Sequence, residues 1–273
     1  MRAIILAAGR GTRLAGVTGD NPKCLMPLGG RPLIERQIES IRSCGISAIT
    51  AVVGYQAARV EEACGLYASA IDNPRFAETN SLYSLWLARE ALHDGFVVLN
   101  ADVLFHTQLL CDLVSSRYED ALLVGFRGPG DGALGDEEMK VKVRGGLVAD
   151  IAKTLPPGDA DGENVGIAKF GARGAHTLVE QLDALVAAGH LREWAPRAFR
   201  EFARLRPLHA IGTRGFPWIE IDFPDDYHRA AGEVLPLIET PSPVEEAAMS
   251  LPPPLAAASD STGAEWRPHS GHV

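Results

Sequence analysis

The stretch Met1–Leu14, which reads MRAIILAAGRGTRL, decides the fold of this chain. Residues 3–6 are all apolar, which is typical of a strand buried on both faces of a sheet. Small residues come next, and they allow backbone N–H groups to approach a phosphate closely: Ala7, Ala8, Gly9 and Gly11. A buried strand that ends in a glycine loop predicts an anion site at the edge of a sheet.

Polar and charged groups follow the glycine loop. Thr12 adds a hydroxyl donor and Arg13 adds a fixed cation. Lys23 comes after a turn-rich segment, residues 19–22. Strand, loop and two cations together predict a polyphosphate site, although a glycine-rich turn without a ligand is the simpler alternative.

Two commoner phosphate loops do not fit this stretch. A dinucleotide fingerprint needs glycine where Leu14 stands, and the chain has no Gly-Lys-Ser or Gly-Lys-Thr triplet for a P-loop. The span instead resembles the signature of the sugar-1-phosphate nucleotidyltransferase family, L-A-A-G-x-G-T-R-L followed at a distance by P-K. Leu6–Leu14, Pro22 and Lys23 fit that signature. The resemblance implies that a nucleotide is bound by Leu6, Ala7, Ala8, Gly9, Gly11 and Thr12. It also implies three catalytic residues: Arg13, Lys23 and Asp102.

Composition narrows the class of protein. The chain has 273 residues, of which 46% are hydrophobic, enough for a globular protein with a substantial core. Its net charge of −9 argues against nucleic acid and anionic membranes as partners, because both repel a net anion. No run approaches about 18 consecutive apolar residues, so we expect no membrane span. We expect a cytoplasmic protein and leave a homo-oligomer open.

The cysteines and histidines show no metal-site spacing. The chain has four cysteines and no C-x-x-C pair, and its histidines show no H-x-x-x-H or H-E pattern. Zinc is therefore unsupported. Reduced thiols are the default in a cytoplasmic protein, so we expect all the cysteines to be reduced: Cys24, Cys44, Cys64 and Cys111.

Strands and helices alternate along the first half of the chain. Strands are predicted at residues 3–6, 49–53, 96–99 and 121–126, with helical segments between them, including one over 103–116. This rhythm is typical of parallel βαβ units.

The pattern changes after Gly128. Residues 139–143 and 147–151 predict a β-hairpin, residues 165–170 a strand, and two helices follow at about 174–188 and 192–204. We therefore predict a Rossmann-like α/β fold with a mixed, mostly parallel sheet, helices on both faces and a small β-rich insert. Its catalytic domain covers 1–238, and a Pro/Ala/Ser-rich tail over 239–273 is expected to be disordered.

Acidic residues stand at two predicted strand ends. Asp102 follows the strand at 96–99, where ligand sites of open α/β sheets lie. Glu220 and Asp222 are two apart on a strand predicted over 217–221, so they share a face. Carboxylate oxygens beside substrate phosphates suit Mg²⁺. The alternatives are a helix cap for Asp102 and a solvated strand end for the acidic pair.

The family resemblance extends over residues 1–235 and gives these acids a role. It implies that Asp102 and Asp222 hold Mg²⁺ between them. Residues 80–85 and 218–222 look like the bacterial choline-phosphate cytidylyltransferases and their phosphonate-cytidylylating relatives. In that branch Glu220 joins the metal site and CTP is the nucleotide. Base specificity is then expected in the segment that contains Asn80 and Ser84.

Residues farther along are candidates for the acceptor side. Lys153 stands where the family has Glu-Lys-Pro, although both flanking residues differ here. Glu163 and Gly166 lie in a segment that resembles the acceptor-side strand of the family. Trp194 could hold a quaternary ammonium by cation–π attraction. The alternatives are a solvated surface lysine and a core tryptophan.

The residues and the resemblance together predict a Mg²⁺-dependent nucleotidyltransferase. An oxygen of a small phosphorylated or phosphonate acceptor attacks the α-phosphate of an NTP, and pyrophosphate leaves. Two alternatives stay open. One is a sugar-1-phosphate enzyme that uses TTP, UTP or GTP, and the other is a nucleotide-binding regulatory subunit without catalysis.

Overall fold

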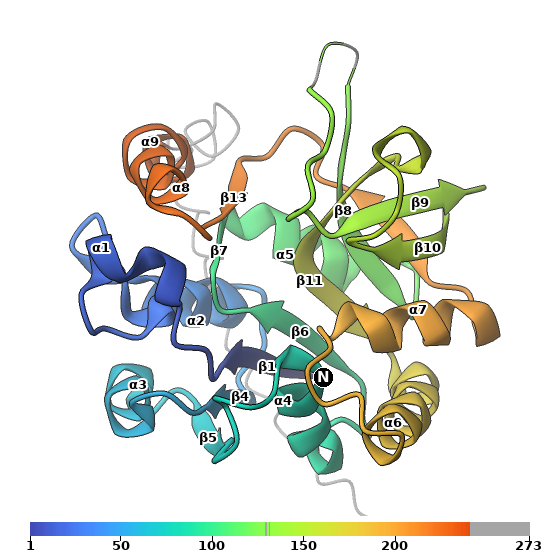
Figure 1. Ribbon diagram of the computed structural model, residues 1–273, viewed down its shortest axis with the longest axis horizontal. Helices are drawn as coiled ribbons and strands as arrows, with labels where there is room; N and C mark the ends of the chain where they lie inside the picture. Colours follow the sequence, from blue (N-terminus) through green and yellow to red (C-terminus); the bar gives the residue numbers. More distant parts are fainter. Residues whose placement is uncertain (129, 131, 241–273) are drawn as a thin grey trace, which may run out of the picture. The chain divides into compact units, whose positions relative to one another are not determined.

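The computed structural model of the chain describes residues 1–128, 130 and 132–240 (Figure 1). Residues 1–239 form one compact unit. Most of the predicted tail, 241–273, lies outside the described residues. None of the helices in the described residues has the length and apolar content needed to cross a membrane.

A nine-stranded mixed sheet forms the centre of the described residues. Its first four strands are parallel, and β11 then runs antiparallel to both of its neighbours, β6 and β8. In spatial order the strands are β5 (Ser69–Asp72), β4 (Ile49–Val53), β1 (Arg2–Ala7), β6 (Phe96–Asn100), β11 (Gly162–Phe170), β8 (Ala121–Phe126), β12 (His209–Gly212), β10 (Leu147–Ala152) and β9 (Lys140–Arg144).

Helices and two short strand pairs accompany this sheet. The helices are α1 (Ala15–Thr18), α2 (Leu33–Ser43), α3 (Ala57–Cys64), α4 (Ser81–Leu87), α5 (Thr107–Ser115), α6 (Ala172–Ala187), α7 (Pro196–Leu205), α8 (Pro224–Arg229) and α9 (Leu235–Glu239), with a π-helical segment at Ala230–Val234. The pairs are β2 (Pro27–Leu28) with β3 (Arg31–Pro32), and β7 (Val103–Phe105) with β13 (Trp218–Glu220).

Helices cover both faces of the sheet, as the all-apolar strands predict. In β1, Ile5 packs into a core with α2, α3 and α5, whereas Ile4 packs into a second core with α4, α6 and α7. A strand with both faces buried needs apolar side chains at every position, since successive side chains point to opposite faces. The predicted α/β fold is thus confirmed.

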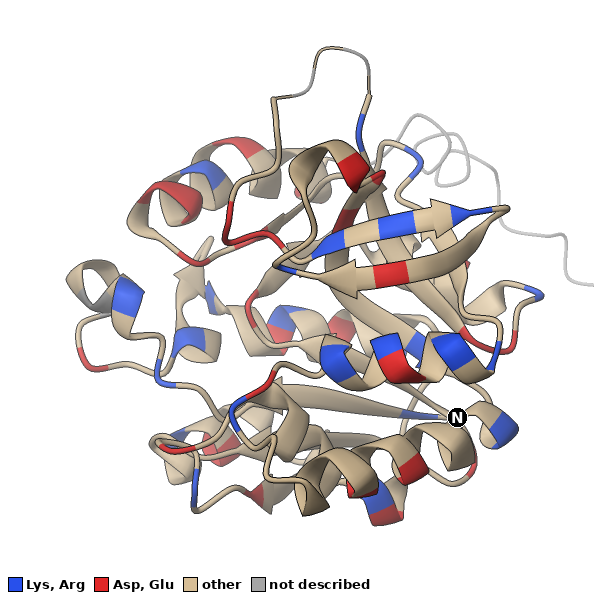
Figure 2. Ribbon diagram, turned by 45° about the vertical axis from the view of Figure 1, so that its right-hand side comes forward, with Lys and Arg blue, Asp and Glu red and all other residues tan. Residues whose placement is uncertain are grey.

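The β9–β10 hairpin is held against α7. In Figure 2, β9 carries basic residues, β10 carries an acidic residue, and α7 carries basic residues together with an acidic one. Arg200 on α7 donates two hydrogen bonds to Asp150 on β10, at 2.5 and 2.9 Å. A bidentate pair of this kind fixes orientation as well as distance, so α7 holds β10 in a defined orientation.

Several local expectations are wrong. Residues 103–105 are not helical but form β7, because they pair with β13 from the far end of the chain. The helix expected from Arg192 starts at Pro196, so Trp194 precedes it. Proline suits the first turn of a helix because its missing N–H would have no partner there. The strands β5 and β12 were not expected at all.

The expectation of reduced cysteines is also wrong for one pair. Cys44, at the end of α2, forms a disulfide with Cys111 on α5, across a sequence separation of 67 residues. Cys24 and Cys64 are free and buried. The C-x-x-C rule could not find this pair, because packing between two helices brings its members together.

Candidate active site

A cavity of about 360 Å³ lies where the carboxyl ends of β1 and β6 meet. These strands are parallel neighbours, and Leu6 lies opposite Asn100 in their register. The glycine loop after β1 and Asp102 after β6 therefore open onto the same edge of the sheet. Ligand sites of open α/β sheets lie at such an edge.

The glycine loop reaches this cavity with its predicted members. Leu6, Ala7, Ala8, Gly9, Gly11, Thr12 and Arg13 all line it. Gly11 has φ +71°, and a Cβ there would stand 2.7 Å from Lys23 Cβ. Only glycine allows both this backbone conformation and the close approach of Lys23.

Lys23 joins two carboxylates that are distant in sequence. Its Nζ lies 2.8 Å from Asp102 Oδ2 and 2.5 Å from Asp222 Oδ1. An apolar cluster brings these segments together, in which Leu14 and Met26 pack with Ile221. Burial would lower the pKa of Lys23, but the charges of Asp102 and Asp222 raise it above its ordinary value. Lys23 is a fixed cation in this arrangement.

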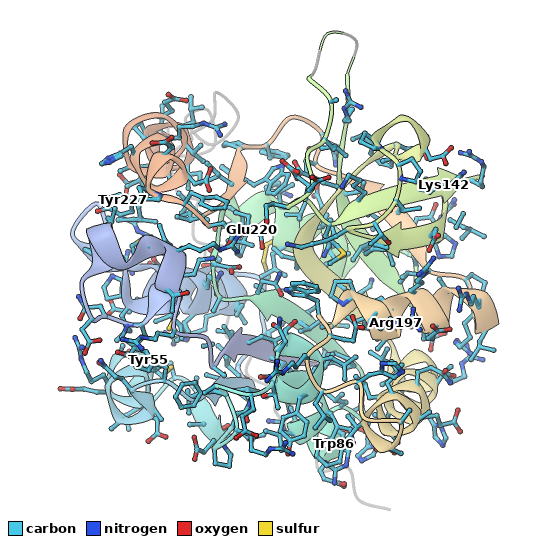
Figure 3. All side chains as sticks on the ribbon, viewed as in Figure 1. Tyr55, Trp86, Lys142, Arg197, Glu220 and Tyr227 are labelled. Carbon is cyan, nitrogen blue, oxygen red and sulfur yellow. A yellow bond between two sulfur atoms is a disulfide. The ribbon has the colours of Figure 1, made fainter. Side chains whose placement is uncertain are left out.

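Asp102, Glu220 and Asp222 form an acidic triad. One carboxylate oxygen from each lies within 4.8 Å of the others, and no other such group of three occurs among the described residues. Figure 3 shows Glu220 near the centre of the view. Ile219, before Glu220, and Ile221, between Glu220 and Asp222, are buried, as strand alternation predicts.

The pKa values of Glu220 and Asp222 are shifted in opposite directions. Burial, followed by the carboxylates of Asp102 and Asp222, raises the pKa of Glu220 to about 8. For Asp222 burial also acts to raise the pKa, but Lys23 and Arg13 hold it below its ordinary value. Burial, aided by the two neighbouring acids, thus disfavours the ionised form of Glu220 near neutral pH.

The chemistry of the triad fits a divalent cation. Asp102 Oδ1 is buried and has no hydrogen-bond partner among the described residues. A buried carboxylate oxygen without a donor is costly unless a cation meets it. The donor set consists only of carboxylate oxygens, which Mg²⁺ prefers over nitrogen or sulfur.

A second cluster of charged residues also lines the cavity and is linked to the triad through Arg13. Glu137 Oε2 lies 3.0 Å from Arg13 Nη1 and 3.2 Å from Lys153 Nζ. Arg13 Nη2 also lies 2.9 Å from Asp222 Oδ2. Lys153 Nζ stands 4.7 Å from the ring centroid of Trp194. Glu137 therefore places a carboxylate between two cations that face the cavity.

The start of α4 forms the side of the cavity next to β4 and β5. Asn80 caps α4, and its side chain accepts from the N–H of Ser81. Ser84 is 4% exposed, and Asn73 donates to its hydroxyl at 3.1 Å. Ser81 Oγ in turn accepts from the N–H of Ala195 at 2.9 Å. The predicted nucleotide side and the segment after Trp194 are thereby joined.

Two predicted acceptor residues lie elsewhere. Among the residues that the structure describes, Glu163 and Gly166 are not part of the cavity lining, whereas Lys153 and Trp194 are. Gly166 instead allows close packing, because a Cβ there would stand 3.0 Å from Asn100 Nδ2 and from Val103 Cγ2.

Sequence reasoning missed several other residues of the lining, among them Asn73, Glu137 and Asn164. Asn164 neighbours the predicted Glu163 on β11, and successive strand residues point to opposite faces. A correct assignment of which β11 side chains face the cavity would have predicted Asn164 in place of Glu163. Glu137 stands in a loop without periodicity, so no sequence signal could place it.

The comparisons with known proteins agree with this geometry. A family model described as the MobA-like NTP transferase domain matches residues 3–206. The chain belongs to this family. It is thus a nucleotidyltransferase.

Two curated relatives are cytidylyl-transferring enzymes. The chain is 40% identical to a choline-phosphate cytidylyltransferase from Streptococcus pneumoniae over 121 residues, which is 43% of this chain and 52% of that protein. It is 35% identical to a CMP-5'-(3-aminopropyl)phosphonate synthase from Streptomyces rubellomurinus over 127 residues, 45% of this chain and 20% of that protein. The matches thus span about half of one relative and a fifth of the other.

A solved structure resembles most of this chain. The CTP:phosphocholine cytidylyltransferase LicC from Streptococcus pneumoniae matches with a TM-score of 0.69 and 26% identity, over 84% of this chain and 97% of that one. The predicted resemblance to the choline-phosphate and phosphonate cytidylyltransferase branch is therefore confirmed.

Proposed function

We propose that this chain is a Mg²⁺-dependent cytidylyltransferase that joins CTP to a small phosphorylated or phosphonate acceptor and releases pyrophosphate. One observation carries the proposal above all. The acidic triad, with the unpartnered Asp102 Oδ1, lies beside Lys23 and the glycine loop in one cavity. Carboxylates for a metal and backbone donors for phosphates are the two parts that phosphoryl-group chemistry needs.

The residues of the chain divide the work by their positions. N–H groups of the glycine loop and the Arg13 guanidinium bind the leaving pyrophosphate. Lys23 stabilises the charge at the α-phosphate, which lies between nucleophile and leaving group. Asp102, Glu220 and Asp222 hold Mg²⁺, which supplies positive charge to the phosphate oxygens when bound.

The acceptor needs little activation. Its phosphate or phosphonate oxygen is already an anion, so catalysis rests on positioning and on charge neutralisation and not on a strong general base. Lys153 is suited to hold this anion. Trp194 offers an aromatic face, 4.7 Å from the Lys153 ammonium, which suits the cationic end of a zwitterionic acceptor. The relatives, whose names include choline-phosphate and aminopropylphosphonate, support this acceptor class.

A matrix of nucleotides against acceptors tests the proposal. Purified protein is incubated with Mg²⁺, each of CTP, UTP, TTP, GTP and ATP, and each of phosphocholine, 2-aminoethylphosphonate, 2-hydroxyethylphosphonate and sugar 1-phosphates, and pyrophosphate is measured. We expect release with CTP and a phosphorylated or phosphonate acceptor. Release only with a sugar 1-phosphate and TTP, UTP or GTP would favour a sugar enzyme. Nucleotide binding without any release would favour a regulatory subunit.

A further inference from the structure

A glutamine in the core lies directly behind the acidic triad. Gln37 belongs to α2 and is 1% exposed. Its helix neighbours Ile34, Ile38 and Ile41 all lie in the apolar core between α2 and the sheet. A primary amide in such surroundings is costly unless hydrogen bonds compensate for its lost hydration. The hydrogen bonds that this amide makes therefore indicate the role of Gln37.

The amide nitrogen of Gln37 holds the segment that carries Asp102. Gln37 Nε2 donates to the carbonyl of Asn100 at 2.9 Å and to the carbonyl of Val103 at 2.8 Å. These carbonyls come directly before and after the dipeptide Ala101-Asp102. One side chain thus holds both ends of the turn between β6 and β7.

Two backbone contacts complete the fixation of this turn. The N–H of Ala101 donates to Leu6 in β1 at 3.4 Å, and the N–H of Ile221 donates to Asp102 at 3.0 Å. The second contact sets Asp102 against the segment of Glu220 and Asp222. With Gln37 from α2, the turn is held by three segments that are distant from one another in sequence: α2, β1 and the residue after β13.

The remaining oxygen shows that packing alone does not explain Gln37. Its Oε1 is buried and has no hydrogen-bond partner among the described residues. A methionine would fill a similar volume without a buried unpartnered oxygen. The gain from glutamine lies in its two N–H donors, and both are directed at the Asp102 turn.

We propose that Gln37 is a positioning residue for the metal site. It fixes the Asn100–Val103 turn so that the Asp102 carboxylate stays at the distance from Glu220 and Asp222 that a divalent cation requires. Gln37 acts through the turn and does not touch metal or substrate. This inference rests on the proposed function, because it assumes that the acidic triad binds the metal.

The direct test measures metal binding without turnover. Free Mn²⁺ is followed by electron paramagnetic resonance during titration of wild type, Gln37→Met and Ser40→Ala. Ser40 is the matched control, because it lies one turn farther along α2, is 9% exposed, and bonds Thr107 Oγ1 at 2.8 Å, away from the turn. We expect Gln37→Met to weaken Mn²⁺ binding about 10-fold or more. Ser40→Ala should bind as wild type does.

Gln37→Glu supports the test if Gln37→Met does not fold. It keeps the shape of the side chain but replaces the donors by an oxygen that faces two carbonyls, so it too should weaken Mn²⁺ binding. Circular dichroism establishes that each variant is folded. For every folded variant, kcat and the Mg²⁺ concentration at half-maximal rate are measured. We expect kcat to fall and the Mg²⁺ requirement to rise, with little change in the KM for CTP.

The outcomes separate the two proposals. Unchanged Mn²⁺ binding in a folded Gln37 variant, or equal weakening by Ser40→Ala, would overturn the positioning role. Failure of wild type to bind Mn²⁺ would instead overturn the metal site itself, and the positioning role with it. Wild-type binding together with a selective loss in the Gln37 variants supports both.

Discussion

The ammonium of Lys23 lies 2.5 Å from Asp222 Oδ1, although 199 residues separate the two in the chain. The same ammonium contacts Asp102, so it holds together the acids at two strand ends. The pair shows how the candidate active site is assembled, since neither segment alone contains a complete set of charges. It also yields the first prediction.

Replacement of Lys23 by methionine should lower both the stability and the activity of the protein, and Mg²⁺ should restore part of the stability only. Without the ammonium, Asp102 and Asp222 repel each other across the cavity, and we expect the free energy of unfolding to fall by about 3 kcal/mol in EDTA. Mg²⁺ should restore part of this loss, while pyrophosphate release stays at least about 100-fold reduced. Urea unfolding with EDTA and with Mg²⁺ measures the effect. Lys142→Met, which removes a lysine on β9 that pairs with Asp159, is the control. No effect of Mg²⁺ on the stability of the Lys23 variant would count against the account.

The glycine loop gives a prediction with a close control. Gly11→Ala adds a Cβ at 2.7 Å from Lys23 Cβ, whereas Gly19→Ala, at a similarly positive φ of +60°, meets open space. Both variants suffer the backbone strain, but only Gly11→Ala displaces Lys23. We expect kcat/KM to fall about 10- to 100-fold for Gly11→Ala and to change little for Gly19→Ala. Equal losses in the two variants would show that backbone strain alone matters.

Glu137 should compete with the substrates for Arg13 and Lys153. Its carboxylate contacts both cations, and it is largely exposed, so each pair contributes little stability. Glu137→Gln frees the cations for phosphate, and we expect the KM values for nucleotide and acceptor to fall about two- to fivefold. Steady-state kinetics checks this result, with Glu39→Gln on α2, which pairs with Arg31, as the control. A rise in both KM values would mean that Glu137 supports substrate binding.

Glu163 makes the stability of the fold depend on pH. Burial, with help from Glu138, raises the pKa of Glu163 from 4.5 to about 7. Between these pH values the unfolded chain has lost the proton that the folded chain still holds, so the free energy of unfolding falls as pH rises and levels off above about 7. The full loss is about 3 kcal/mol at most.

Glu163→Gln should remove this pH dependence. The variant is expected to gain stability relative to wild type as the pH rises from 5 to 8, because the neutral amide carries no charge to bury. Thermal unfolding across this pH range measures the difference. A constant difference between variant and wild type would contradict the raised pKa.

Much of the site could be predicted because it depends on strand ends. The residues after β1 and β6 meet wherever parallel neighbours end together, and period-two alternation placed Glu220 on the face opposite the buried Ile219 and Ile221. The signature from Leu6 to Lys23 added the chemistry. Local pattern and three-dimensional position agree at these residues.

Other features depend on contacts that no local pattern records. Residues 103–105 became a strand because β13 pairs with them, and Cys44 meets Cys111 because α2 packs near α5. Glu137 reaches the cavity from an aperiodic loop. The role that we assign to Gln37 depends on a turn 63 residues away in sequence, which helical periodicity on α2 cannot indicate.

The central claim is metal-dependent nucleotidyl transfer at Asp102, and one measurement tests it most directly. Pyrophosphate release from CTP and a phosphorylated or phosphonate acceptor is followed with Mg²⁺ and with EDTA, for wild type, Asp102→Asn and Asp112→Asn. Asp112 pairs with Arg214 on the surface and is the matched control. We predict release by wild type and Asp112→Asn only with Mg²⁺, and a loss of about 1000-fold in folded Asp102→Asn. Release that persists in Asp102→Asn, or that EDTA leaves unchanged, would contradict the account.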